Sequence, residues 1–433
     1  MSRVNPESKN NTGAGISSGA LFILLLLAGI PLHAQESNAV ILRRGDSFNV
    51  IDEKIREVIG NVEFQQGNVF VSCDKAIQYL TTNRVELRGN VRVVQDTVTL
   101  TAPHGFYDGN TKTAFGDGGV RLNNRHMTIS ADSGRYLTGE KKAFFSRNMM
   151  VVDSSSVLLA REGTYDQNTR KAECRRNVKV RSKTDNTIIY GNYLEHYDEN
   201  NYTRIPDEPR LVQIDTANGT IDTLFIVSTL MESYDDTSKR FIATDSVRIM
   251  RGQTAALAGK GTYYSGKNRI VLESSPIVWY EQNQLTGDTI VITTKQRKLD
   301  RLVVRGNAFA ASKSDSLTTT RFNQLTGRDL TMEFDGGKLQ RIVVERTATS
   351  LYYVYEEEGP SGANRSSGDM ISLIFSQGRL RDINVVGGVQ GSYYPEKMIL
   401  GKEHDYDLAG FRWVSHRPSF RYIGDTIVEQ NYE

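Results

Sequence analysis

The chain has 433 residues, which is enough to bury a large core in two or three domains or in one extended array. Its 53 Lys and Arg residues nearly balance its 51 Asp and Glu residues. This balance leaves no overall positive field of the kind that nucleic-acid binding needs, so DNA and RNA are not expected as partners.

The N-terminus predicts a secretory signal peptide over residues 1–34. Arg3 and Lys9 precede the apolar run ALFILLLLAGIPL at 20–32, and the cleavage-like sequence His33-Ala34-Gln35 follows it. About 13 apolar residues interrupted by a proline fall short of the roughly 20 that span a bilayer, so cleavage is favoured over a retained anchor. We therefore expect an exported protein.

The two cysteines, Cys73 and Cys174, would be free to pair in an oxidising compartment. They lie in different columns of the repeat described next, more than three repeats apart. Stacked strands would separate their Cα atoms by more than the roughly 7 Å that a disulfide spans. The sequence therefore predicts two separate thiols.

A similar string returns every 29 residues, with no slippage in the spacing. Its copies begin at Gly60, Gly89, Gly118, Arg147 and Arg176. Other columns keep the same register: Ala102, Ala131 and Ala160; Tyr107, Tyr136 and Tyr165; Ala114, Ala143 and Ala172. These columns identify an internal repeat.

Each copy contains an alternation of apolar and polar residues with period two, which predicts a half-buried strand. The positions predicted to face inward are Val62, Phe64, Val91, Val93, Val120, Leu122, Met149, Val151, Val178 and Val180. Arg92, Arg121 and Lys179 are predicted to face outward, where Met150 is an apolar exception.

Turn residues divide each repeat into at least two strands. Gly or Asn ahead of each strand predicts a turn with left-handed backbone, and a second turn is expected at 108–110, 138–140 and 166–168. No segment beyond the signal peptide shows helical periodicity, which excludes helical repeats. The pattern predicts an all-β fold of stacked strands with a shared interior.

The repeat is expected to loosen after Arg181, in a polar segment that ends where strands resume at 244–250 and 274–280. Repeats of about 40 residues then open at Gly287, Gly327 and Gly368, and the segment YEEEGPSGANRSSG at 355–368 predicts an exposed loop. We expect a repeat domain at 40–285, clearest at 60–180, then longer repeats at 286–420 and a tail at 421–433.

Catalytic and metal-binding patterns are not found. Asp74, Pro103, Asp132 and Arg161 occupy successive copies of one column, so no acid–base pair recurs in neighbouring repeats. The histidines His104, His126, His196, His404 and His416 are scattered, and we expect surface or structural roles for them. The sequence predicts neither catalysis nor a cofactor.

Two columns allow a bland and a functional interpretation. The outward basic column, with Arg248 as a later member, suits a solvated sheet face better than phosphate binding. The tyrosine column is expected to pack against neighbouring layers. The inward column is a dry core if the array is closed, or a groove lining if it is open, and periodicity alone does not decide between them.

The repeated units APHGFYDGNTKTAFGDGGVRL and AREGTYDQNTRKAECRRNVKV resemble the signature of the OstA-like proteins. The resemblance covers about Gly60 to Val180 and includes the SCDKA string around Cys73. These proteins are relatives of the lipopolysaccharide-transport protein LptA and of the N-terminal domain of LptD. The resemblance implies a cupped β-jellyroll whose interior carries lipopolysaccharide acyl chains and whose edge strands join end to end.

Under this resemblance, the ten inward residues line the groove, and lipopolysaccharide or a related glycolipid is the expected ligand. Other Lpt-type transport proteins would bind through edge strands. The expected place is the periplasm of a Gram-negative bacterium, with or without association with the outer membrane. LptA has less than half this length and LptD ends in a long barrel, so we expect a soluble periplasmic carrier or bridge.

Two other classes stay open. One is a structural or adhesive secreted β-solenoid with a dry core, which solvent-inaccessible inward columns would support. The other is a polysaccharide-acting β-helix enzyme, which needs clustered Asp, Glu or Lys in adjacent layers.

Overall fold

A computed structural model describes residues 39–217, 220–234, 239–296, 298–315, 320–357 and 359–430. The described strands belong to one compact unit, Asn38–Glu433. The predicted signal peptide lies outside the described residues.

The first strands are β1 (Ile41–Arg44), β2 (Ser47–Asp52), β3 (Ile55–Gln66), β4 (Val69–Tyr79), β5 (Arg84–Gln95), β6 (Val98–Asp108), β7 (Thr113–Asn123), β8 (Thr128–Leu137), β9 (Lys142–Val152), β10 (Ser156–Asp166), β11 (Lys171–Ser182) and β12 (Thr187–Tyr197). They are followed by β13 (Tyr202–Pro206), β14 (Arg210–Ala217), β15 (Thr220–Val227), β16 (Leu230–Tyr234), β17 (Arg240–Arg251), β18 (Thr254–Tyr264), β19 (Arg269–Glu273), β20 (Ile277–Tyr280), β21 (Asn283–Thr286) and β22 (Thr289–Lys295). The remaining elements are β23 (Lys298–Lys313), β24 (Phe322–Asp335), β25 (Lys338–Glu356), β26 (Gly359–Ser376), β27 (Arg379–Val386), β28 (Gln390–Pro395), α1 (Glu396–Ile399), β29 (Phe420–Ile423) and β30 (Thr426–Glu429), with 3-10 turns at Ser265–Lys267 and Glu403–Tyr406.

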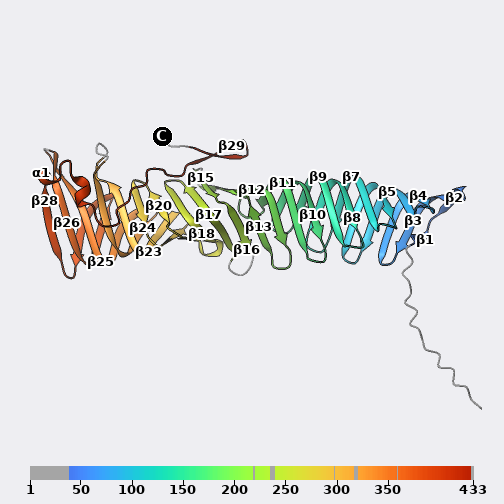
Figure 1. The fold of residues 1–433 in the computed structure, drawn as a ribbon, viewed down its shortest axis with the longest axis horizontal. Coiled ribbons are helices and arrows are strands. Elements are labelled where there is room, and N and C mark those ends of the chain that lie inside the picture. Colours follow the sequence, from blue (N-terminus) through green and yellow to red (C-terminus); the bar gives the residue numbers. More distant parts are fainter. Residues whose placement is uncertain are drawn as a thin grey trace, which may run out of the picture. The chain divides into compact units, whose positions relative to one another are not determined.

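The strands β1 to β28 form one antiparallel sheet of 28 strands, and β29 and β30 form a separate hairpin. Figure 1 shows that these 28 strands succeed one another in chain order. At one end β1 and β2 both pair with β3, and at the other end β27 and β28 both pair with β26. The all-β, stacked antiparallel fold is therefore confirmed.

The 29-residue period is the spacing of strand pairs. The strands β3, β5, β7, β9 and β11 begin at Ile55, Arg84, Thr113, Lys142 and Lys171, each 29 residues after the last. The turns expected at 108–110, 138–140 and 166–168 lie at the ends of β6, β8 and β10. One repeat is therefore one antiparallel pair.

The Gly and Asn residues ahead of each apolar string have the expected left-handed backbone, but they do not form turns. Gly89 and Asn90, at φ 73° and 45°, lie in the middle of β5, where the pairing with β6 shifts register between Arg88 and Val91. Such an extra residue is a β-bulge, which bends the strand and leaves it continuous. The prediction of a turn was therefore wrong.

The bulges divide the sheet into two walls. The first wall holds the N-terminal halves of β3, β5, β7, β9 and β11 with the C-terminal halves of β4, β6, β8, β10 and β12, and the second wall holds the other halves. Apolar side chains from both walls form one buried cluster, so the walls face each other.

The sheet also continues where the sequence predicted interruptions. The polar segment after Arg181 contains β12 to β16, and the expected loop at 355–368 belongs to the paired strands β25 and β26. Both predictions were wrong, because low apolar content was taken as a sign of irregular structure.

A C-terminal strap, defined here as Glu396–Glu429, runs back over the outer side of the sheet. At its start the buried Arg321 donates to Glu396 at 2.6 Å and to Glu403 at 3.2 Å. At its end the hairpin of β29 and β30 packs Phe420 and Ile427 onto β12, β14 and β15. Figure 1 shows this hairpin beside the middle strands.

Candidate functional site

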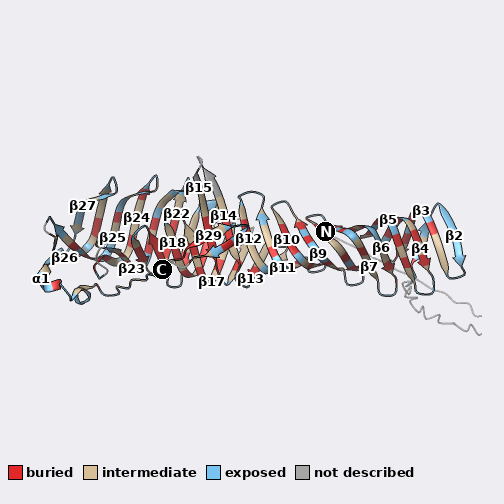
Figure 2. Ribbon diagram, turned by 90° about the horizontal axis from the view of Figure 1, so that it is seen from above, coloured by how far each residue is buried: buried red, intermediate tan, exposed pale blue. Residues whose placement is uncertain are grey.

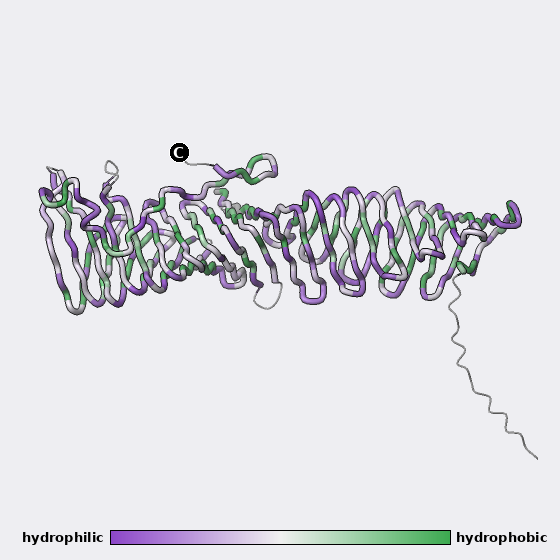
Figure 3. Tube along the Cα trace, in the orientation of Figure 1, coloured by the Kyte–Doolittle hydropathy of each residue, from purple (hydrophilic) through white to green (hydrophobic). Residues whose placement is uncertain are grey.

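The ten residues predicted to face inward lie in the second wall, on β3, β5, β7, β9 and β11. All of them except the half-buried Val180 are buried, from 0% exposed at Val62 to 7% at Val151. Figure 2 shows buried positions recurring along each strand, and Figure 3 shows the matching alternation of hydropathy. Their inward orientation is confirmed, and their contact with lipid stays a prediction.

Sequence reasoning missed the residues that face them across the interior. The first wall contributes Val58, Ala76, Val85, Leu87, Ala114, Ala143, Phe145, Ala172, Cys174 and Leu194. The alanine column at 114, 143 and 172 was visible in the sequence, but nothing placed it opposite the valines. The interior is therefore lined from two walls.

A second apolar cluster continues the interior through the later strands, from Leu211 to Ile371. Ile189 of β12 packs against both clusters, so the apolar lining passes from the 29-residue repeats into the longer ones without a gap.

Buried polar groups recur at one side of the interior. Tyr107 donates to Gln66 at 2.6 Å, Tyr136 donates to Gln95 at 2.8 Å, and Asn124 donates to Tyr165 at 2.9 Å. Burial raises the pKa of each tyrosine, so all three hydroxyls stay protonated at neutral pH. The tyrosines pack between layers, as predicted.

The outward basic column has two different environments. Arg92 and Arg121 are exposed, as a solvated sheet face requires. Lys179 instead pairs with Asp425 of the strap, and Arg248 pairs with Glu429 at 2.6 Å. The later members of the column therefore anchor the hairpin.

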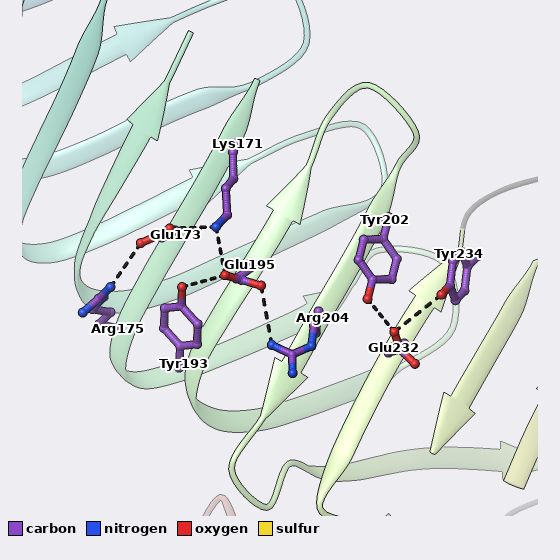
Figure 4. Close-up of polar contacts among 9 residues, drawn as sticks. All are labelled: Lys171, Glu173, Arg175, Tyr193, Glu195, Tyr202, Arg204, Glu232 and Tyr234. Carbon is purple, nitrogen blue, oxygen red and sulfur yellow. Dashed lines mark hydrogen bonds and ion pairs between the residues drawn. The ribbon is translucent and has the colours of Figure 1, made fainter. Parts of the chain in front are cut away.

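A network of charged residues covers the outer face of the first wall from β11 to β16 (Figure 4). Lys171 lies 2.8 Å from Glu173 and 2.9 Å from Glu195, and these contacts hold the pKa of both carboxyls below their ordinary values. Tyr193 and Arg204 also contact Glu195. Both carboxylates are ionised and paired, so neither acts as a proton donor at neutral pH.

The aspartates of the irregular column have a structural role. Asp74 and Asp132 accept hydrogen bonds from Asn90 and Asn148, at 2.9 Å and 3.0 Å, and so lie against the bulges of β5 and β9. Both asparagines have positive φ. An aspartate at this position closes the corner between the walls.

Cys73 and Cys174 are both buried free thiols, and burial raises their pKa to about 11 and about 12. In the described part of the chain, no group of three or more His, Cys, Asp or Glu side chains is arranged to hold a metal ion. Nor does any helix described there have the length and apolarity that crossing a bilayer requires.

Two family models match the sequence. Residues 37–189 match a model described as OstA-like protein, and residues 157–298 match one described as LptA/(LptD N-terminal domain) LPS transport protein. No curated protein matches the sequence at a significant level.

Among solved structures, the chain is similar to LptH of Pseudomonas aeruginosa, described as the LptA-homologous periplasmic component of the conserved lipopolysaccharide transport device. The identity is 13%, and the match covers 33% of this chain and 95% of LptH at a TM-score of 0.26. That score is too low to bear on fold or function. The two family models confirm the resemblance seen in the repeats, and through residues 37–298 the chain belongs to the OstA-like and LptA/LptD N-terminal family of lipopolysaccharide-transport proteins.

Proposed function

We propose that this protein is a non-catalytic periplasmic component of lipopolysaccharide transport, and that it holds acyl chains between its two walls. The observation that carries the proposal is the apolar interior, which passes without a gap through both repeat regions. The family matches support the same function. Lipopolysaccharide or a related glycolipid is the proposed ligand, and other Lpt-type proteins are the proposed partners.

The energetics allow such binding. About a dozen buried methylenes at ~0.8 kcal/mol each contribute roughly 10 kcal/mol before the costs of ordering are subtracted. Side chains of both walls fill the interior, so the acyl chains enter only when the walls separate. No covalent chemistry is needed.

Site-specific photo-crosslinking tests this function. A diazirine-bearing aliphatic amino acid replaces Val91, Val120 or Val178, because its size is close to that of the buried side chain. The exposed Arg92 and Arg121 are matched outward controls. Lipopolysaccharide adducts are expected in cells from the inward positions only. Absence of adducts from a folded, exported protein would contradict the proposal.

The second candidate is a structural secreted array with a dry core. The specific observation in its favour is that the inward columns are inaccessible to solvent. It predicts no adduct at either face, and no binding of acyl-chain probes to the purified protein at tens of micromolar, so the same experiment separates the two functions.

A further inference from the structure

The two walls meet along one side of the interior in a row of contacts between side chains, which we call the seam. Its members are Tyr107, Tyr136 and Tyr165 of the first wall and Gln66, Gln95 and Asn124 of the second wall. Within each wall the members are 29 residues apart, so the seam repeats with the strand pairs. The seam therefore runs along the array, with one contact in each repeat.

Each seam contact is made of neutral hydrogen bonds. Gln95 accepts from Tyr136 at 2.8 Å and donates to the carbonyl of Thr138 at 3.1 Å. Gln66 repeats both bonds with Tyr107 and with the carbonyl of Gly109. Outside the central contact, Lys141 forms an ion pair with Asp96 across the same line at 2.6 Å. The seam is thus polar inside and charged outside.

The opposite side of the interior is closed in a different way. There each of the strands β3, β5, β7, β9 and β11 passes from one wall to the other through its bulge, so the backbone itself joins the walls. At the seam no strand crosses between these repeats, and side chains alone hold the walls together. The walls can therefore part at the seam while the sheet pairing stays intact.

The chemistry of the seam suits reversible opening. Its neighbours in the same inward rows are apolar: Val69 and Val98 in the second wall, and Ala114 and Ala143 in the first. Apolar side chains would close the gap without leaving polar groups that need partners. Tyrosine and glutamine instead exchange their partners for water when the walls separate, which lowers the cost of exposing them.

We propose that the seam is the lateral entrance through which an acyl-chain lipid reaches the interior, with its polar group left at the Tyr and Gln side chains. This inference rests on the proposed function. It places entry along the side of the array, whereas a permanently closed seam would require the lipid to thread in from an end.

A reversible bridge across the seam tests the entrance. Asp96→Cys and Lys141→Cys are combined in one variant and joined by a short bis-thiosulfonate linker, which a reductant removes. The bridge lies beside the central contact, Gln95 with Tyr136. The matched control joins Asn68→Cys to Asp96→Cys, whose native side chains lie 3.0 Å apart within the second wall. Protein with only the buried native thiols, Cys73 and Cys174, controls for background labelling.

The rate at which purified protein takes up a fluorescent acyl-chain probe is measured before bridging, after bridging and after reduction. We expect the bridge across the seam to slow uptake at least tenfold, reduction to restore it, and the control bridge to leave it unchanged. Tyr136→Phe, which removes one hydrogen bond of the seam, is expected to speed uptake severalfold.

Three outcomes are informative. Slower uptake only with the bridge across the seam supports lateral entry. Equal uptake with and without that bridge overturns the entrance and leaves the lipid-binding function standing, because the lipid then enters from an end. No uptake by the unmodified protein overturns the proposed function itself, and the entrance with it.

Discussion

Asp74 and Asn90 show how one residue acquires a role that its own column does not reveal. Asp74 alternates in the sequence with Pro103, Asp132 and Arg161, which gives no chemical pattern. The structure pairs it with the bulge on the next strand, where Asn90 takes φ 45° and donates to its carboxylate. Asparagine tolerates this backbone better than most residues, and the aspartate fixes it there.

His196 is the residue whose protonation is expected to change the stability of the fold. Burial lowers its pKa, which Asp153 and Asp198 act to raise, and its Nδ1 lies 3.0 Å from Thr203 Oγ1. Because the folded-state pKa lies below the unfolded value of 6.5, the unfolded chain binds more protons as pH falls below about 6.5. The stability associated with neutral His196 is therefore complete above this pH and is lost as pH falls towards the folded pKa.

A His196→Gln variant tests this expectation, because glutamine keeps a polar partner for Thr203 and does not titrate in this range. The free energy of unfolding in urea is compared for the two proteins at pH 7.5 and at pH 5. The advantage of the native protein should shrink at the lower pH. A difference that stays constant between the two values would contradict the assignment.

Among the elements, the sequence predicted best those strands that are buried on one face. The strands β3 to β11 alternate between buried and exposed, so their type, period and inward face could be read directly. The strand β15 could not be read in this way, since Leu224, Phe225, Ile226 and Val227 are all buried in succession. Two of them face the interior and two lie under the strap, and burial on both faces removes the alternation.

The hairpin at the end of the strap depends on two apolar side chains. Phe420 and Ile427 are buried against Val212, Phe225 and Val227. Phe420→Ala is expected to cost about 3 kcal/mol, to release the hairpin and to expose this apolar patch, because a buried aromatic side chain is removed. The expected result is increased binding of a hydrophobic dye and faster proteolysis near Arg417 and Arg421.

The matched control for this variant is Ile423→Ala on the same hairpin, where the native side chain is 59% exposed. It should change neither dye binding nor cleavage. Similar effects from both variants would show that the hairpin is not held by its buried residues.

For the whole molecule, the sequence gave the stacking of strands but not the division into two walls. The division depends on bulges within continuous strands and on contacts such as Tyr107 with Gln66, which are 41 residues apart. Nothing in a period of 29 indicates a contact at 41. The sequence could therefore predict which residues face inward, and it could not predict which wall each of them faces.

The free edges of the sheet set how the molecule can associate. In the described residues, β2 pairs only with β3, and its Phe48, Val50 and Ile51 are all exposed. An exposed apolar edge favours pairing with another strand, and charge on the edge opposes it. Val50→Lys combined with Ile51→Lys should therefore lower concentration-dependent association, measured by sedimentation velocity. Met398→Lys, at an exposed apolar position on α1 away from this edge, should have no effect. If both variants sediment like the native protein, end-to-end joining through β2 is contradicted.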